Sequence, residues 1–173
     1  VNISSDIKIT AKKVGININA ILDFLNSNTT NSDKNININL NATDSYLYIG
    51  NNRHVISDNI NLQYFDNILN AQLTHKNGSA GFKLENKEFY LYGDKFNDEF
   101  MENLFAFSKF KCGNLSFSMN GTTKEYNGIF YIKNTIIMEY KLLNNVLAFV
   151  NTIPSLVTFS LPNYDKDGLA VKS

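Results

Sequence analysis

Residues 35–94 read NININLNATDSYLYIGNNRHVISDNINLQYFDNILNAQLTHKNGSAGFKLENKEFYLYGD, and apolar and polar side chains alternate through most of this stretch. A period of two is typical of strands with one buried face. Turn-forming residues separate the alternating runs at spacings that match consecutive hairpins, at residues 50–52, 66–67, 77–78 and 85–86. The stretch therefore predicts an antiparallel meander whose sheet is covered on one side only.

The segment before the meander predicts one strand and one helix. Residues 6–18 alternate in the same way, which suits a half-buried strand. Asn19 can cap a short helix, and that helix would bury Ile21, Leu22, Phe24 and Leu25. Residues 26–34 are all polar, and they predict a loop between the helix and the meander.

Residues 97–173 predict a second helix, a second meander and a third helix. Asn97 offers a side-chain oxygen to the free amides of a helix start, and two acidic residues follow it at the positive end of the helix dipole. A third helix is expected from residue 142 to about residue 151, because Pro154 stops it. The second meander has a turn at residues 120–121 and apolar positions at Leu115, Phe117, Met119, Ile129, Tyr131, Ile136 and Met138.

These elements predict a mainly β fold with short helices, of the α+β class. The antiparallel meander sheet would form a curved, groove-like β structure with about three helices. Residues 1–173 are interpreted as a single β-rich fragment of a longer protein. Residues 1–96 would hold the first meander with the N-terminal helix, and residues 97–173 would hold the helix, the second meander and the last helix.

The charge composition argues against nucleic acid as a partner. The chain has 16 basic and 16 acidic side chains, so its formal net charge is zero, and Arg53 is its only Arg. Without a basic stripe, little is available to neutralise phosphates and release their counterions. No stretch approaches the ~18 consecutive apolar residues of a membrane span, so a membrane anchor or targeting signal is expected outside these residues.

Groups for catalysis or metal binding do not converge in the sequence. His54 and His75 lack the HxxxH, HxH and HExxH spacings of metal ligands, and both are interpreted as surface histidines. Cys112 is interpreted as a half-buried small apolar residue and not as a nucleophile. The sequence therefore predicts a protein that is not an enzyme and that uses no metal or cofactor.

Apolar side chains are abundant on the predicted strands, which carry long rows of Ile and Leu, and the whole chain has 13 Phe and 9 Tyr. Two interpretations remain open: the helices fill these rows as an ordinary core, or three short helices leave part of the rows uncovered as a trough. A trough would suit acyl chains, because burying each methylene is favourable by about 0.8 kcal/mol. The candidate lipid-binding residues are Phe82, Leu84, Phe89, Leu91, Leu115, Phe117, Met119 and Ile129.

Residues 112–173 combine a strand pair, a helix with a Pro-terminated end and a Gly-Leu strand start. The residues that carry this pattern are Gly113, Gly121, Gly128, Leu142, Leu143, Leu147, Pro154, Phe159, Gly168 and Leu169. The pattern resembles the C-terminal region of the AsmA-like envelope proteins. It covers about a third to a half of the chain, and the first meander is similar to the same proteins more loosely.

The resemblance implies a periplasmic protein that is anchored in the inner membrane by a helix outside these residues. Proteins of that family build an extended β groove with an apolar interior and are linked to phospholipid movement toward the outer membrane. The implied partner is a phospholipid or another acyl-chain lipid, and the family offers no catalytic residues to transfer. The alternative is a non-catalytic structural or protein-interaction module of the cell envelope, whose open sheet edge takes a partner by strand addition.

Overall fold

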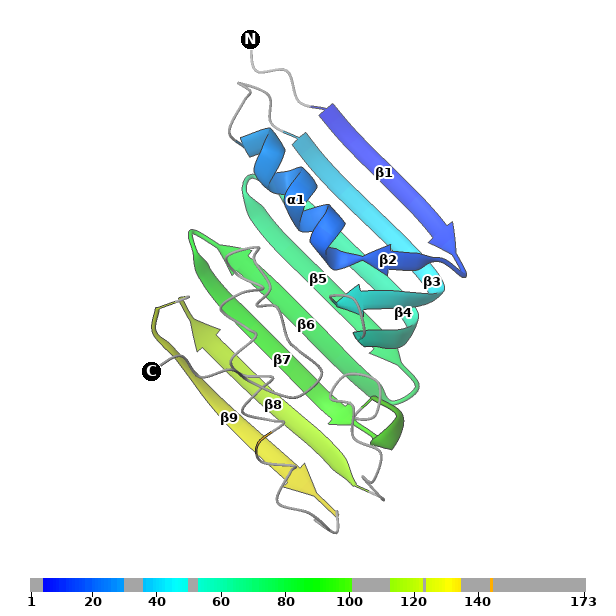
Figure 1. Cartoon of the computed structure of the whole chain (residues 1–173), viewed down its shortest axis with the longest axis vertical. Helices are drawn as coiled ribbons and strands as arrows, with labels where there is room; N and C mark the ends of the chain where they lie inside the picture. The colour runs from blue at the N-terminus through cyan, green and yellow to red at the C-terminus, as the bar shows by residue number, and fades with distance from the viewer. Residues whose placement is uncertain are drawn as a thin grey trace.

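The computed structural model describes residues 5–29, 36–49, 53–100, 113–122, 124–134 and 144. The described part of the chain forms one open sheet of nine strands, with the order β1-β3-β4-β5-β6-β7-β8-β9 and with β2 also paired to β3 (Figure 1). The elements are β1 (Ser5–Lys12), β2 (Gly15–Asn17), α1 (Ile18–Thr29), β3 (Ile36–Ile49), β4 (Arg53–Phe65), β5 (Ile68–His75), β6 (Gly78–Glu85), β7 (Glu88–Phe96), β8 (Asn114–Gly121) and β9 (Tyr126–Lys133).

The mainly β prediction is confirmed, and the strands from β3 to β9 pair antiparallel in chain order. The turn at Asp66 and Asn67 lies where the sequence predicts it, and both residues have the positive φ that a two-residue hairpin of primed type requires. The next two hairpins turn one residue away from the prediction, at residues 76–77 and 86–87. The predicted turn at residues 50–52 lies outside the described residues.

The β6–β7 turn gives a stability prediction. Asn86 and Lys87 have φ angles of 51° and 69°, and a side chain at the second of these positions is strained where Gly is not. We expect Lys87→Gly to raise the free energy of unfolding by about 0.5 kcal/mol, because relief of strain is partly offset by the larger entropy of the unfolded chain. Urea unfolding measures this change. Lys87→Ala is the control, since it removes the charge and keeps the strained backbone; equal stabilisation by both variants would contradict the prediction.

The edge of the sheet formed by β1 and β2 differs from the prediction. Residues 6–18 form two strands instead of one, because Lys13 adopts a φ of 56° between them, and both strands pair parallel with β3. Parallel pairing needs a crossover connection, and α1 provides it. The Asn17 side-chain oxygen accepts a hydrogen bond from the Asn19 backbone N–H at 3.0 Å, so the helix cap is Asn17 and not Asn19. The helix continues to Thr29, into the segment predicted as a polar loop.

The long strands β3 and β4 bend at one point. On β3, Ala42 and Ser45 are both buried while the two residues between them are exposed, and Asp44 has a φ of 49°. On β4, Ser57 and Ile60 are likewise buried around two exposed residues. The alternation of inward and outward side chains is therefore offset by one residue at this point on both strands. This shift keeps apolar side chains on the same face of the sheet past the bend.

The second half of the chain matches the prediction at its helix start and differs from it at its hairpin. Asn97 begins a helix as expected, since its side-chain oxygen accepts a hydrogen bond from the Phe100 backbone N–H at 3.2 Å. The β8–β9 turn corrects the prediction: β8 continues through Gly121, and the turn closes with a hydrogen bond from the Thr122 N–H to the Glu125 carbonyl at 2.8 Å. Predictions for Cys112, for the strand at Ile136 and Met138, and for all of the third helix except residue 144, which is helical, lie outside the described residues.

Candidate functional site

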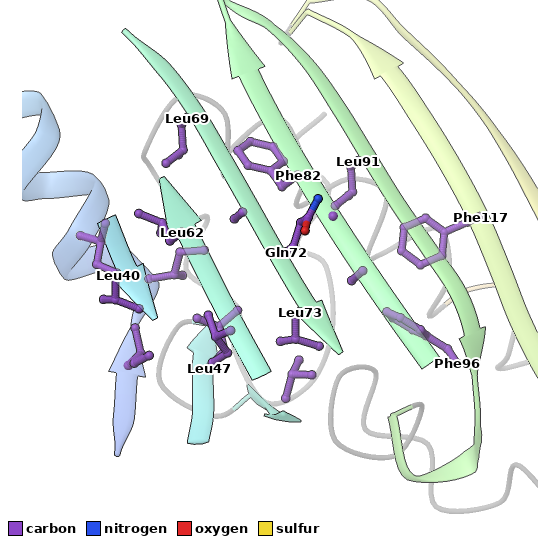
Figure 2. A pocket seen from close by; sticks show the side chains of 18 residues that line it. Leu40, Leu47, Leu62, Leu69, Gln72, Leu73, Phe82, Leu91, Phe96 and Phe117 are labelled. Atoms are coloured by element: carbon purple, nitrogen blue, oxygen red, sulfur yellow. The ribbon is translucent and has the colours of Figure 1, made fainter. Parts of the chain in front are cut away.

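An apolar pocket lies on the face of the sheet that α1 covers (Figure 2). Its volume is about 130 Å³. Among the described residues that line it, Gln72 has the only polar side chain. The lining residues are Ile16, Ile18, Ile21, Leu40, Leu47, Val55, Ile60, Leu62, Leu69, Ala71, Gln72, Leu73, Ala80, Gly81, Phe82, Leu91, Phe96 and Phe117.

Small side chains at inward positions of the central strands create the space. The register places Ala71 of β5 between Leu62 and Phe82, and it places Ala80 of β6 opposite Leu73. A sheet face packs at crystal-like density only when neighbouring side chains fill the space between them. Two alanines among Leu and Phe leave such a space open, so the pocket follows from residue size at these two positions.

The wall on the α1 side comes from three isoleucines. Ile16 on β2 is buried, whereas Ile18 and Ile21 on α1 are half-buried and pack against the core. The crossover between β2 and β3 brings them over the sheet, so this wall depends on the parallel edge. The sequence prediction missed these residues as part of the site because the alternation of residues 6–18 gave no sign of the parallel pairing with β3.

The opposite wall is aromatic. Phe96 and Phe117 contact each other edge to face, with ring centroids 5.5 Å apart. Both rings lie over Gly93, where a Cβ atom would come within 2.5 Å of the Phe117 ring and 3.0 Å of the Phe96 ring. Phe96 also stacks on Phe100, with centroids 4.4 Å apart. These contacts hold the wall as one cluster, in which Phe96, Phe100 and Phe117 are all buried.

The eight predicted groove residues divide into three groups. Phe82, Leu91 and Phe117 line the pocket. The next four, Phe89, Leu115, Met119 and the partly buried Leu84, belong to the hydrophobic core. Ile129 is a correction: its side chain is 74% exposed, and it pairs with the outward-facing Ser118. The inward positions of β9 are Phe130 and Ile132, which pack against the core, because the strand period of two puts residue 129 on the opposite face.

His75 also corrects the sequence interpretation, because it is buried and not on the surface. Its Nδ1 lies 3.0 Å from an Asp58 carboxylate oxygen, and its Nε2 lies 3.3 Å from a Glu99 carboxylate oxygen. Lys76 Nζ donates to the same Glu99 oxygen, and the Lys76 backbone N–H donates to Asp58 at 2.6 Å. This cluster joins β4, the β5–β6 turn and the start of the second helix. The contacts are long-range, so spacing in the sequence gave no sign of them.

The two carboxylates of this cluster predict acid sensitivity. The hydrogen bond from the Lys76 backbone N–H, followed by His75, lowers the pKa of Asp58, and the hydrogen bond from Lys76 Nζ, followed by His75, lowers the pKa of Glu99. A lowered folded-state pKa contributes stability that is present above the unfolded value, about 4 for these groups, and that is lost as pH falls through the folded value. Both side chains are partly exposed, so solvent screening makes the contribution modest.

We therefore expect Asp58→Asn to lower the free energy of unfolding at pH 6. This loss should become smaller as the pH falls below about 4, because the wild-type carboxylate then loses its charge. Urea unfolding of both proteins across this pH range measures the difference. A destabilisation of equal size at pH 6 and at pH 3 would mean that the charge of Asp58 does not contribute.

Within the described ranges, no group of three or more His, Cys, Asp or Glu side chains is arranged to hold a metal ion. No described helix has the length and apolar character needed to cross a membrane. Comparisons of the chain with protein-family models, with curated proteins and with solved structures find no match.

Proposed function

We propose that this chain is a non-enzymatic binding module whose apolar pocket accommodates a hydrocarbon chain. In this proposal it is a segment of an AsmA-like envelope protein of the periplasm, held at the inner membrane by an anchor outside these residues, and it shields phospholipid acyl chains between the inner and outer membranes. One observation supports the binding function: a pocket of about 130 Å³ in which a single side chain among the described lining residues is polar. Such a surface offers an alkyl chain favourable contacts and offers a headgroup almost no partners.

An apolar row across the sheet supports the same proposal. Cross-strand pairing aligns inward residues of seven neighbouring strands, and the row passes through the floor of the pocket at Ala71. Adjacent positions in such a row are about 4.8 Å apart. The β1 end of the row is open, because Ile9 is 41% exposed there. The aligned residues are Ile9, Leu40, Leu62, Ala71, Phe82, Leu91 and Met119.

The size of the pocket limits what it can take. A cavity of about 150 Å³ accommodates a molecule the size of benzene, and this pocket is slightly smaller at about 130 Å³. It therefore suits a short length of one acyl chain and not both chains of a phospholipid. A phospholipid would place one tail against the row and leave its headgroup in water, and neighbouring segments of a longer protein would cover the rest.

Calorimetric titration of the chain with linear alcohols of increasing length tests the proposal, because these ligands are uncharged. Each added methylene is worth about 0.8 kcal/mol when buried, which is about a fourfold gain in affinity. We expect saturable one-to-one binding that tightens with chain length and then reaches a plateau when the pocket is full. Absence of saturable binding, or an affinity that does not depend on chain length, would overturn the proposal.

Strand addition is a second candidate function, favoured by the edge at β9. Among the described strands only β8 pairs with β9, and residues 127–132 carry no charged side chain that would protect an edge. If this edge takes a second copy of the chain as its partner, sedimentation velocity should show assembly of the wild type, and Ile129→Lys should abolish that assembly and leave alcohol binding intact. Assembly that is unchanged in this variant would contradict a role for the β9 edge.

A further inference from the structure

We propose that the outward face of the sheet, opposite the pocket, binds a neutral oligosaccharide over Tyr90 and Tyr92 of β7. The two tyrosines face away from the pocket, because Leu91 between them lines it and successive side chains of a strand point to opposite faces. The carrying observation is an exposed row of side chains, here called the outer row, in which amides lie on both sides of Tyr90. Cross-strand pairing aligns the outer row from β5 to β9, and its members are Asn70, Lys83, Tyr90, Asn120 and Asn127.

The two tyrosine rings form a broad aromatic surface on the sheet. Their centroids are 5.9 Å apart, and their planes are inclined by 36°. Tyr92 lies over Gly81 of β6, where a Cβ atom would collide with the ring. Glycine at this position therefore lets the ring lie close to the backbone of the neighbouring strand. Tyr90 is 47% exposed, so this surface is open to a ligand from solvent.

The amides of the outer row have hydrogen-bonding groups to offer. Nearer the β1 edge, amides on the same face bond one another, since Asn61 Nδ2 donates to the Asn41 side-chain oxygen at 2.6 Å. No hydrogen bond to another described residue engages the side chains of Asn70, Asn120 or Asn127. Each of these amides can accept through its oxygen and donate through its NH₂ group. The tyrosine pair is therefore flanked by groups that can bind hydroxyls.

The charge of the outer row suits an uncharged ligand. Lys83 is its only charged member, and Lys83 Nζ lies 2.7 Å from a Glu85 carboxylate oxygen. An anionic ligand would meet a single cation that already has a carboxylate partner. The net charge of the whole chain is zero, so no overall field attracts ions of either sign.

A neutral sugar chain has the matching chemistry. Its hydroxyls both donate and accept hydrogen bonds, as the amides do, and the C–H faces of its rings can pack on aromatic rings. The outer row is about 19 Å long, given a strand spacing of about 4.8 Å, which is enough for an oligosaccharide and more than a single sugar needs. A protein partner fits less well, because the outer row has no aliphatic side chain to form the apolar centre of such an interface.

Calorimetric titration with cellohexaose, maltohexaose and chitohexaose tests the proposal, because all three sugars are uncharged. We expect saturable binding of at least one of them. Tyr90→Ala should then lower its affinity by about tenfold, because the stacking surface is lost, and Tyr90→Phe should keep it. Asn120→Ala should lower it by about fivefold through the loss of a hydrogen bond, and it remains informative if Tyr90→Ala does not fold. Absence of saturable binding by all three sugars would overturn the proposal.

Tyr46→Ala is the matched control. Tyr46 and Tyr48 form a second exposed pair on β3, with centroids 6.5 Å apart and the same inclination of 36°. Their cross-strand neighbours on β4 are Ile56 and His54, where the outer row has amides. Tyr46→Ala should therefore leave sugar binding unchanged. Equal losses of affinity in Tyr46→Ala and Tyr90→Ala would mean that sugars adsorb to any exposed tyrosine, and would overturn the assignment to the outer row.

Discussion

Ala71→Phe is expected to abolish alcohol binding, with an affinity loss of at least about 100-fold, which corresponds to about 2.7 kcal/mol. Residue 71 lies between Leu62 and Phe82 at the floor of the pocket. An aromatic ring there would occupy the volume that the proposal gives to the ligand. The folded state should tolerate the ring, because filling an existing cavity commonly raises the free energy of unfolding by about 0.5–2 kcal/mol.

Two further variants keep this prediction falsifiable. Asn70→Phe adds the same ring one residue earlier on β5, where the side chain is exposed on the opposite face, and it should leave binding unchanged. Ala80→Leu fills the pocket from the neighbouring strand and should weaken binding even if Ala71→Phe is overpacked. Calorimetry with 1-decanol and thermal unfolding measure both properties. Undiminished binding in a well-folded Ala71→Phe protein would place the ligand elsewhere.

Leu115→Ala should have the largest effect on stability. Leu115 has no exposed surface and lies on β8 between Phe96 and Ile132. Truncation of a buried Leu to Ala costs about 2–5 kcal/mol, because it loses burial and leaves a cavity. For a chain of this length that loss corresponds to a fall in Tm of about 10 °C.

Ile129→Ala is the matched control for this substitution. Both residues belong to the predicted groove set, but the Ile129 side chain is 74% exposed on the other face of the sheet. Its truncation should change the free energy of unfolding by less than about 0.5 kcal/mol. Thermal unfolding of the two variants under the same conditions compares their losses of stability. Equal destabilisation would mean that β9 presents residue 129 to the core.

The hairpins could be predicted from the sequence because each depends on neighbouring residues. Alternation fixes which side chains of a strand share a face, and residues such as Asp66 and Asn67 tolerate the backbone of a tight turn. The same local rule placed Phe82 and Leu91 on one face, and the structure puts both in the pocket lining. It failed at Ile129 because β9 has apolar or aromatic residues on both of its faces, so apolarity alone did not identify the inward phase.

The remaining features depend on contacts between distant parts of the chain. Apolar and polar residues can alternate in the same way in parallel and in antiparallel strands. The alternation of β1 and β2 therefore did not indicate their parallel pairing with β3, and the isoleucine wall was not predicted. The small side chains at Ala71 and Ala80 were visible as inward positions, but their effect depends on the larger residues that the register places beside them. The position of His75 between Asp58 and Glu99 likewise arises only when three elements meet.

Isotope-filtered nuclear Overhauser spectroscopy on the full chain with bound 1-decanol tests the central claim most directly. The claim predicts contacts from the ligand methylenes to Ala71, Phe82 and Leu91, with the alcohol end giving weaker contacts or none. It also predicts that these contacts vanish in Ala71→Phe and persist in Asn70→Phe. Contacts confined to the opposite face, such as those to the exposed side chains of Tyr90 and Tyr131, would contradict a hydrocarbon site in this pocket.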